Sequence, residues 1–577
     1  MLLVSAPDNI YPLLTFEGGG TLIALAAAFA WPRLGNGLFQ CIERAFAALA
    51  RRRGLSVAVC GLSLLVLRLA ILPMMPMPKP FAPDDFSSLL AADTFEHGRL
   101  TNPTPALWTH FETIHVTMHP TYMSMYFPGQ GLLLAAGKVV LGSPWLGVLV
   151  SSALMCAALC WALQAWLPPN WALLGGLLAV LRLGLFSYWT NTYHTAGALA
   201  AVGGALVLGA LPRLMKTARL SYALLMAAGI VLLIFTRPYE GVLLCLPVAV
   251  ALGHWALKGK NRPAPLVLVR RAVLPLALVA AALAWLGYYD YRAFGNPLTL
   301  PYSVDRAQYA VAPYYVWQKP HPEPAYRHPE MRRFYYDSEM VVYYHEHSLL
   351  GYPLVTLVKV WTAVIFFAGY ALLPPLIMLR RVLHDRRIRF LVQGVLVLMA
   401  GMLIMIYMIP HYLAPFTIAF YAIGLQAMRH LRVWRPEDKP VGTALVRLCV
   451  LLCFVLGGLR AFSAPLHLPV AEWPASNWST LWYGPDVYGT DRAHVVSELE
   501  SHAGLQLALV RTSPNRNVLD QWIYNGADLN TARVLWAYDM GAAQNAELMR
   551  QYPGRTAWII DLATEPATVT PYIEAAH

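Results

Sequence analysis

The chain has 577 residues, of which 58% are hydrophobic and only 13% are charged. Globular soluble proteins carry about 25% charged residues, so this composition excludes an ordinary soluble chain, and it also excludes disordered, collagen-like and disulfide-rich secreted proteins. The net charge of +12 would suit a nucleic-acid-binding protein. However, the basic residues form short clusters between apolar runs, which is typical of loops between membrane spans. The composition therefore predicts a multi-span membrane protein with no nucleic-acid partner.

Apolar runs of membrane-crossing length recur along the chain. A helix needs about 20 apolar residues to cross the hydrocarbon core. Runs near that length predict spans at 13–32, 55–73, 145–166, 171–187, 189–211, 221–236, 241–257, 272–289, 354–379, 390–409, 412–428 and 442–462. The shorter run 128–141 predicts a half-span or re-entrant helix. We therefore expect an all-α polytopic membrane protein with about 11–13 spans.

Basic clusters between these runs predict the orientation of the chain. Such clusters mark cytoplasmic loops, and they occur at 51–53, 213–219, 258–271, 380–389 and 429–439. With these loops inside, the loops 74–127 and 290–352 lie on the outer face. We expect three parts, which are an N-terminal span with a basic cytoplasmic loop (1–54), a transmembrane domain (55–463) and an extracytoplasmic domain (464–577).

The C-terminal tail from residue 464 is polar and differs from the rest of the chain. Alternating or β-branched runs predict strands at 505–511, 533–538 and 556–561. Asp491 predicts the N-cap of a helix that ends near residue 502, and a second helix is expected near 542–551. The tail therefore predicts a small α/β domain on the outer face.

Two adjacent acidic residues, Asp84 and Asp85, begin the first outer loop. The apolar positions of residues 83–98 predict an amphipathic helix that lies along the membrane interface. In one interpretation Asp84 is the N-cap of this helix, an ordinary position for Asp. In the other, the carboxylates deprotonate a hydroxyl group or hold a divalent metal against a phosphate. The residues alone leave both interpretations open.

Further polar residues lie at the outer ends of spans. Arg237 and Glu240 interrupt two spans, and such residues at membrane depth mark a functional site or form a local ion pair. The other candidates for a polar pocket are Arg99, Tyr126, Asn191, His194 and His411. The histidines at 110, 115 and 119 have spacings that match no specific metal site.

The order of these parts resembles the GT-C superfamily of membrane glycosyltransferases, and more narrowly the bacterial glycosyltransferase family 39. That family is related to protein O-mannosyltransferases and to the aminoarabinose transferase of lipid A. The resemblance rests on the acidic pair Asp84-Asp85 after an early span, a loop helix, the Pro128-Gly129 segment that begins the next helix, and the later turn Arg237-Pro238-Tyr239-Glu240-Gly241. It covers roughly residues 55–430 and is best at 83–142 and 182–241.

The resemblance implies transfer of a sugar from a polyprenyl-phosphate donor to a glycan, lipid or protein of the cell envelope, on the outer face of the cytoplasmic membrane. It places the catalytic role on Asp84, with Asp85 where relatives commonly have Glu. Arg237, Arg99 and His411 are expected to stabilise the phosphate leaving group, while Glu240, Tyr126, Asn191 and His194 complete the substrate-binding set.

A divalent cation such as Mg²⁺ or Mn²⁺ is optional in this scheme, and no other cofactor is expected. A multi-pass transporter is the main alternative, although the chain shows no internal repeat and its polar residues collect at one face. Another lipid-phosphate-dependent envelope enzyme, such as a ligase, is the remaining alternative.

Overall fold

The computed structural model describes residues 13–259, 262–463, 465–468 and 489–573. Among the described residues, seven helices are long and apolar enough to cross a membrane. They are α4 (Arg53–Ala70), α7 (Pro144–Trp166), α9 (Gly197–Thr217), α11 (Pro238–Lys258), α12 (Pro265–Phe294), α16 (Gly351–Ala368) and α20 (Val441–Ala461). The protein is therefore a multi-pass membrane protein, as the composition predicts.

Shorter helices complete the membrane domain. The apolar ones include α2 (Gly19–Ala30), α6 (Pro128–Leu141), α10 (Leu220–Thr236) and α18 (Arg389–Leu403). The helices α8 (Pro169–Ala179) and α19 (Thr417–Arg432) pack beside them. At 14 residues, α6 is about 21 Å long and is shorter than the hydrocarbon core. The centre of the bundle is formed by α7, which packs against α4, α6 and α9, while α9 packs in turn against α10.

Several predicted spans have different boundaries in the structure. The prediction of a span at 189–211 was wrong at its start, because α9 begins at Gly197. Side chains in the preceding loop bind the backbone and compete with helix formation; the Asn191 side chain, for example, donates to the carbonyl oxygens of Leu185 and Ser187. The span expected at 412–428 begins instead at Thr417, since Pro415 lies in the short helix η6 (Pro410–Phe416).

Two other predicted spans end early. The span expected at 354–379 ends at Ala368, because Gly369 adopts a φ of 58° and two prolines follow at 374 and 375. The span expected at 390–409 ends at Leu403.

The short helix η6 packs closely on α9. A Cβ added at Gly204 of α9 would overlap the Pro415 carbonyl group. Glycine at this position therefore allows η6, which carries His411, to pack closely on α9.

The loop helix α5 (Pro83–Glu96) forms where the sequence predicts it, but it does not lie against lipid. Ser87, Leu90 and Thr94 are buried on it. The C-terminal domain covers it, with Phe86 stacked on Tyr524 at 4.6 Å between ring centroids. The prediction of an interfacial amphipathic helix was therefore wrong, because the faces of α5 pack against protein.

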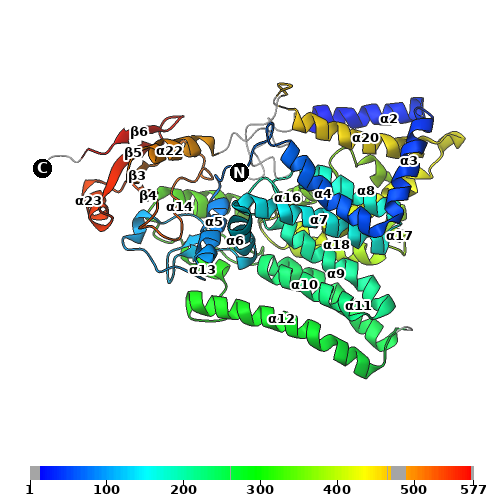
Figure 1. Cartoon of the computed structure of the whole chain (residues 1–577), viewed down its shortest axis with the longest axis horizontal. Helices are drawn as coiled ribbons and strands as arrows, with labels where there is room; N and C mark the ends of the chain where they lie inside the picture. The colour runs from blue at the N-terminus through cyan, green and yellow to red at the C-terminus, as the bar shows by residue number, and fades with distance from the viewer. Residues whose placement is uncertain (1–12, 260–261, 464, 469–488, 574–577) are drawn as a thin grey trace.

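The C-terminal domain is a small α/β unit at one end of the molecule (Figure 1). In the described chain, its strands follow the order β4 (Val534–Tyr538), β3 (Leu505–Arg511), β5 (Arg555–Asp561) and β6 (Thr568–Pro571), and only the last pair is antiparallel. Its helices are α22 (Thr490–Ser501) and α23 (Ala542–Gln551). Asp491 does not cap α22; Gly489 is the N-cap, and Asp491 pairs with Arg516 at 2.8 Å.

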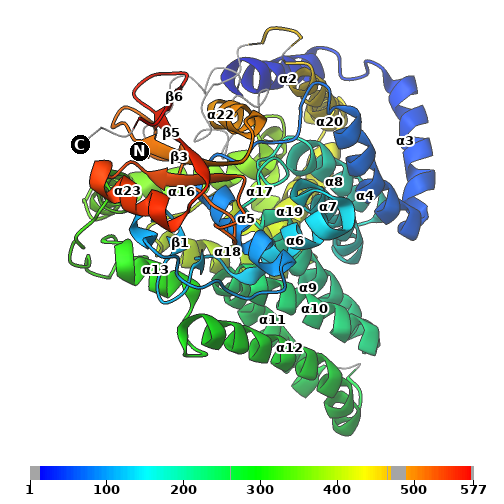
Figure 2. The same cartoon turned by 60° about the vertical axis from the view of Figure 1, so that its left-hand side comes forward.

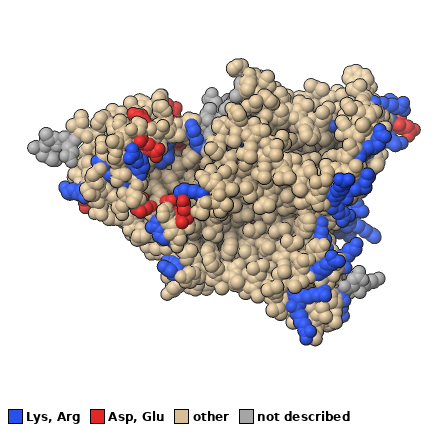
Figure 3. Space-filling model, in the orientation of Figure 1, with Lys and Arg blue, Asp and Glu red and all other residues tan. Residues whose placement is uncertain are grey.

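Charge is unevenly distributed along the molecule. Figure 3 shows Lys and Arg side chains gathered at the end opposite the C-terminal domain. The helix α3 (Asn36–Arg51) lies at this basic end, roughly across the direction of the membrane helices (Figure 1). The segments between α12 and α16 pack at the other end, next to the C-terminal domain, and include α13 (Pro301–Tyr309), α14 (Pro329–Arg332) and α15 (Glu339–Glu346).

Candidate active site

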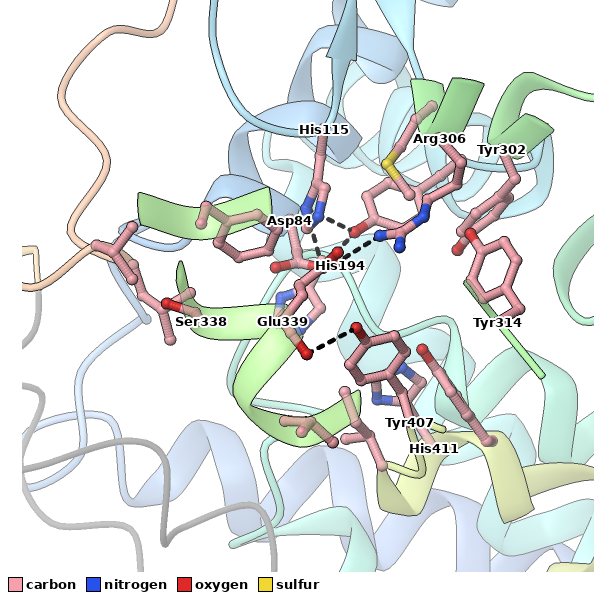
Figure 4. Close-up of a pocket in the computed structure, with 18 of the residues that line it drawn as sticks. Asp84, His115, His194, Tyr302, Arg306, Tyr314, Ser338, Glu339, Tyr407 and His411 are labelled. Carbon is pink, nitrogen blue, oxygen red and sulfur yellow. Dashed lines mark hydrogen bonds and ion pairs between the residues drawn. The ribbon is translucent and has the colours of Figure 1, made fainter. Parts of the chain in front are cut away.

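A cavity of about 220 Å³ lies where the membrane helices meet the C-terminal domain. Residues from many separate segments line it, among them α5, α13, α15, η6 and the loops before α6, α9 and α11. They include Asp84, His115, Tyr126, His194, Arg237, Tyr302, Arg306, Tyr314, Glu339, Tyr407, His411, Tyr412 and residues 517–519 of the C-terminal domain. Figure 4 shows Asp84, His115 and His194 on one side of this space, and Tyr302 and Tyr314 on the other.

Asp84 presents its carboxylate to the cavity. It lies in the first turn of α5, where Ala82 is the N-cap and no capping side-chain hydrogen bond forms in the described structure. The interpretation of Asp84 as an N-cap was therefore wrong. Its side chain is 22% exposed, and its Oδ1 accepts a hydrogen bond from the hydroxyl of Tyr126. Its Oδ2 has no hydrogen-bond partner among the described residues and can receive a proton from a ligand.

His115 supports Asp84 from the neighbouring loop. The Nδ1 atom of His115 is 3.0 Å from the Tyr126 hydroxyl and 3.5 Å from Asp84 Oδ1. A hydroxyl has one hydrogen, so when Tyr126 donates to Asp84 it accepts from His115. His115 has a φ of 63°, which a residue with a side chain rarely adopts. Its backbone N–H donates to the Tyr335 hydroxyl at 3.0 Å, which holds it in place.

The charges of Asp84 and His115 stabilise each other. Burial by itself raises the pKa of Asp84, but the positive charge of His115 brings this pKa well below its usual range. Burial by itself lowers the pKa of His115, whereas the negative charge of Asp84 raises it above its usual value. Asp84 is therefore ionised over the physiological pH range.

Asp85 does not face the cavity. Its residue is only 1% exposed, and its Oδ1 accepts hydrogen bonds from the Tyr193 backbone N–H at 2.9 Å and from His194 Nδ1 at 2.8 Å. Burial lowers the pKa of His194, but the charge of Asp85 outweighs that effect and raises it. Asp85 therefore positions His194, which does line the cavity, and has no direct access to a ligand there.

Arg237 is a half-buried cation that has no carboxylate partner among the described residues. Its Nη2 donates to the Thr195 carbonyl oxygen at 3.2 Å, and its guanidinium lies over the Tyr412 ring at 4.7 Å. Within the described chain it makes no ion pair within 4 Å, and its buried Nε has no hydrogen-bond partner. A buried N–H group of a guanidinium that lacks a partner is costly unless an acceptor such as an anion binds it. The expected local ion pair with Glu240 is absent from these described residues.

The other predicted site residues divide between the cavity and its surroundings. His411 lines the cavity, and its Nδ1 lies 2.9 Å from the Tyr188 hydroxyl. Glu240 and Arg99 are not among the described residues that line it. Asn191 is also outside it, and its Oδ1 accepts from Arg68 Nε at 3.2 Å and Nη2 at 3.0 Å. Asn191 therefore connects the loop before α9 to α4.

An ion pair inside the cavity was not predicted from the sequence. Arg306 Nη1 lies 2.6 Å from Glu339 Oε1, and the two residues come from α13 and α15. Tyr302, Tyr314 and Tyr407 extend the aromatic lining beside them (Figure 4). The density of aromatic and charged residues in the loop 290–352 is the only signal in the sequence that could have indicated this set.

The residues that the structure describes around the cavity do not form a metal site. In the described parts of the chain, no group of three or more His, Cys, Asp or Glu residues is placed to hold a metal ion. The carboxylate of Asp85 is occupied by His194, so the acidic pair cannot chelate a cation together. The histidines at 110, 115 and 119 likewise do not form a ligand set.

No protein-family model matches the chain, and no curated protein matches its sequence. Among solved structures, it is similar to ArnT from Cupriavidus metallidurans in the apo state, with 13% identity over 88% of this chain and 92% of that chain and a TM-score of 0.47. The same protein bound to undecaprenyl phosphate gives 13% identity over 90% and 96% and a TM-score of 0.49. The Archaeoglobus fulgidus oligosaccharyltransferase tethered with an acceptor peptide has 13% identity over 77% of this chain and 57% of that chain, with a TM-score of 0.42.

At 13% identity the similarity concerns the fold and not the roles of individual residues.

Proposed function

We propose that this protein is a membrane glycosyltransferase that moves a sugar from a polyprenyl-phosphate donor to a hydroxyl group of a cell-envelope acceptor. One observation carries the proposal: a single cavity contains an ionised carboxylate, Asp84, and a half-buried cation, Arg237. Among the described residues, one oxygen of Asp84 has no hydrogen-bond partner and Arg237 has no carboxylate partner. Glycosyl transfer from a lipid phosphate needs both groups, because it removes a proton from one substrate and creates a charge on the other.

Arg237 is the group for the donor phosphate. In the transfer, the bond between the anomeric carbon and the phosphate oxygen breaks, and its electron pair remains on the phosphate. A guanidinium stabilises this growing negative charge, particularly in a site from which water is excluded. Its free Nε–H is available for a hydrogen bond to a phosphate oxygen.

Asp84 is the group for the acceptor. The acceptor oxygen forms the new bond to the anomeric carbon, and its proton passes to Asp84 Oδ2. The lowered pKa makes Asp84 a weak base, so we expect it first to orient the hydroxyl and to take the proton as the new bond forms. Its negative charge also stabilises the positive charge that develops on the sugar ring in glycosyl transfer.

The aromatic lining suits a sugar between these two groups. Tyr302 and Tyr412 approach the cavity from different segments, and flat aromatic faces pack well against the apolar faces of a sugar ring. The described residues 517–519 place part of the C-terminal domain in the wall of the same cavity. The C-terminal domain therefore helps to enclose the reaction.

The charge distribution supports an orientation for this chemistry. Basic clusters favour the cytoplasmic side, and they gather at the end opposite the C-terminal domain (Figure 3). With that end in the cytoplasm, the cavity lies on the outer side of the cytoplasmic membrane. Soluble nucleotide sugars are cytosolic, whereas a lipid-linked donor reaches this side through the bilayer.

The test is transfer by the purified protein in lipid nanodiscs. Labelled sugars on polyprenyl phosphate are supplied with envelope glycan, lipid and protein fractions, and the labelled product is analysed by mass spectrometry. We expect product with the parent protein and none with Asp84→Asn. Movement of the donor across proteoliposome membranes, without transfer by any of these donors, would overturn the proposal in favour of a transporter. If transfer is observed, a comparison of envelope glycans from cells with and without the protein will identify the acceptor.

A further inference from the structure

A second large cavity lies at the basic end of the molecule, away from the candidate active site. Its volume is about 800 Å³, and α3, α8 and α20 form its walls. Most of its lining is apolar, and consists of Phe39, Ile42, Phe46, Ala47, Trp171, Leu174, Leu177, Leu178, Val446, Val450, Leu451 and Phe454. The remaining lining residues are polar or charged, and they are Gln40, Glu43, Arg44, Asn170, Arg432 and Arg447.

The helix α3 creates this cavity because it stands away from the bundle. Figure 2 shows it at the edge of the molecule, separated from α2 and α20. Ion pairs connect α3 to α19 and α20, because Glu43 contacts Arg432 Nη2 and Arg447 Nε, each at 2.9 Å. Its apolar residues Leu38 and Ile42 are 68% and 53% exposed, as expected of an amphipathic helix that lies in the membrane interface.

The charged part of the cavity has an excess of positive charge. Arg44, Arg432 and Arg447 line it, while Glu43 is the only acidic residue among the described lining residues. Glu43 pairs with Arg432 and Arg447. Arg44 makes no ion pair in the described chain; its Nε donates to the Gln40 carbonyl oxygen. Its terminal guanidinium N–H groups are therefore available to an anion.

This combination fits one class of ligand. An apolar interior at membrane depth excludes a soluble anion, and an apolar helix of a partner protein would leave the surplus arginine charge without a counterion. A lipid with an anionic head group satisfies both parts, and basic pockets between membrane helices bind such head groups. We propose that this cavity is a binding site for one anionic phospholipid, whose acyl chains lie among Trp171, Leu174 and Val450 and whose phosphate contacts Arg44 and Arg432.

The test is native mass spectrometry of the purified full-length protein after incubation with equal amounts of phosphatidylglycerol and phosphatidylcholine. We expect one phosphatidylglycerol to be retained in preference to phosphatidylcholine. Near a membrane, each basic residue raises the binding constant for an anionic lipid by a factor of about 5. Arg44→Gln should therefore lower the preference by about fivefold. Arg44 is exposed, so this substitution removes no buried contact.

The matched control is Arg51→Gln, on the same face of α3 two turns further along and outside the cavity lining. An equal loss of preference in Arg51→Gln would show a general surface effect and would overturn the site. Val450→Trp should fill the apolar interior and abolish retention of the bound lipid. Undiminished retention in that variant would also overturn the proposal, as would replacement of phosphatidylglycerol by polyprenyl phosphate at equal concentration.

Discussion

Asp84 and Asp85 are neighbours in the chain, but their carboxylates have different surroundings. Asp84 accepts a hydrogen bond from the Tyr126 hydroxyl at the edge of the cavity, whereas Asp85 accepts from the buried His194 ring. Successive residues of a helix point about 100° apart, so the first turn of α5 directs one acid toward the cavity and the other into the protein. Substitution of the two acids is therefore expected to affect different properties of the protein.

We expect Asp84→Asn to lose transfer and Asp85→Asn to lose stability. Asn keeps the shape of Asp but cannot accept the acceptor's proton, so transfer by Asp84→Asn should fall by about two or more orders of magnitude. The variant should stay folded and lose only the stability that the ion pair with His115 contributes. In Asp85→Asn the charge-assisted bond to His194 is weakened, at a cost on the order of 1–3 kcal/mol. Transfer rates and thermal melting of both variants in nanodiscs measure the two effects.

Asp385→Asn is the control for this experiment. Asp385 lies at the basic end and contacts His430 at 3.1 Å, so its loss should leave the transfer rate unchanged. Normal transfer by Asp84→Asn would contradict the catalytic role of this acid. Loss of transfer in Asp85→Asn alone, at normal stability, would assign the role to Asp85.

Arg237 should be required for the departure of the donor phosphate. Removing one group that stabilises developing charge costs roughly a hundredfold to a thousandfold in rate, and we expect Arg237→Ala to show a loss of this size. Arg237→Lys keeps the charge but loses the planar arrangement of N–H groups, so its rate should be intermediate. Single-turnover transfer measures both. An unchanged rate in Arg237→Ala would leave this residue with only its packing against Tyr412.

The stability that His115 contributes should depend on pH. Burial lowers the pKa of His115, but Asp84 raises it above the usual value of about 6.5. Because the folded protein binds this proton more tightly than the unfolded chain, the contribution is fully present below the unfolded value and is lost as the pH rises through the raised pKa. His115→Asn should therefore lower the melting temperature most at acidic pH, and parent and variant should converge at alkaline pH.

Melting curves across this pH range, with His384→Asn as a control, test the effect. His384 is exposed and its Nδ1 lies 2.7 Å from the Arg380 carbonyl oxygen, so its replacement should not produce the same dependence. A difference between parent and His115→Asn that stays constant with pH would contradict the Asp84–His115 ion pair.

The proposed orientation predicts which positions a membrane-impermeant thiol reagent can reach in intact cells. Ser303 is exposed next to the cavity, and Lys439 is exposed at the basic end. In a background with the exposed Cys41 changed to Ser, Ser303→Cys should label and Lys439→Cys should not. Labelling of Lys439→Cys but not of Ser303→Cys would show that the orientation is the opposite one, with the cavity on the cytoplasmic side.

The sequence was sufficient for the class of fold and for much of the local structure. Long apolar runs identify membrane helices, and the strand predicted at 505–511 forms as Leu505–Arg511. These features depend on residues that are close together in the chain. The ends of helices were predicted less accurately than their presence. The helix α9, for example, begins at Gly197 because polar side chains in the loop before it bind the backbone.

The composition of the cavity was decided by the tertiary structure. The sequence indicated Asp84 and Arg237 as site residues, but it could not show that Asp85 turns inward to His194, 109 residues away. Nor could it show that Arg306 meets Glu339 across 33 residues, or that Tyr335 holds the backbone of His115 across 220. A pattern in the sequence reports on neighbours within a few turns or strands, whereas burial and charge at this cavity depend on contacts between distant segments. Those contacts exist only once the C-terminal domain and the outer loops have packed against the membrane helices.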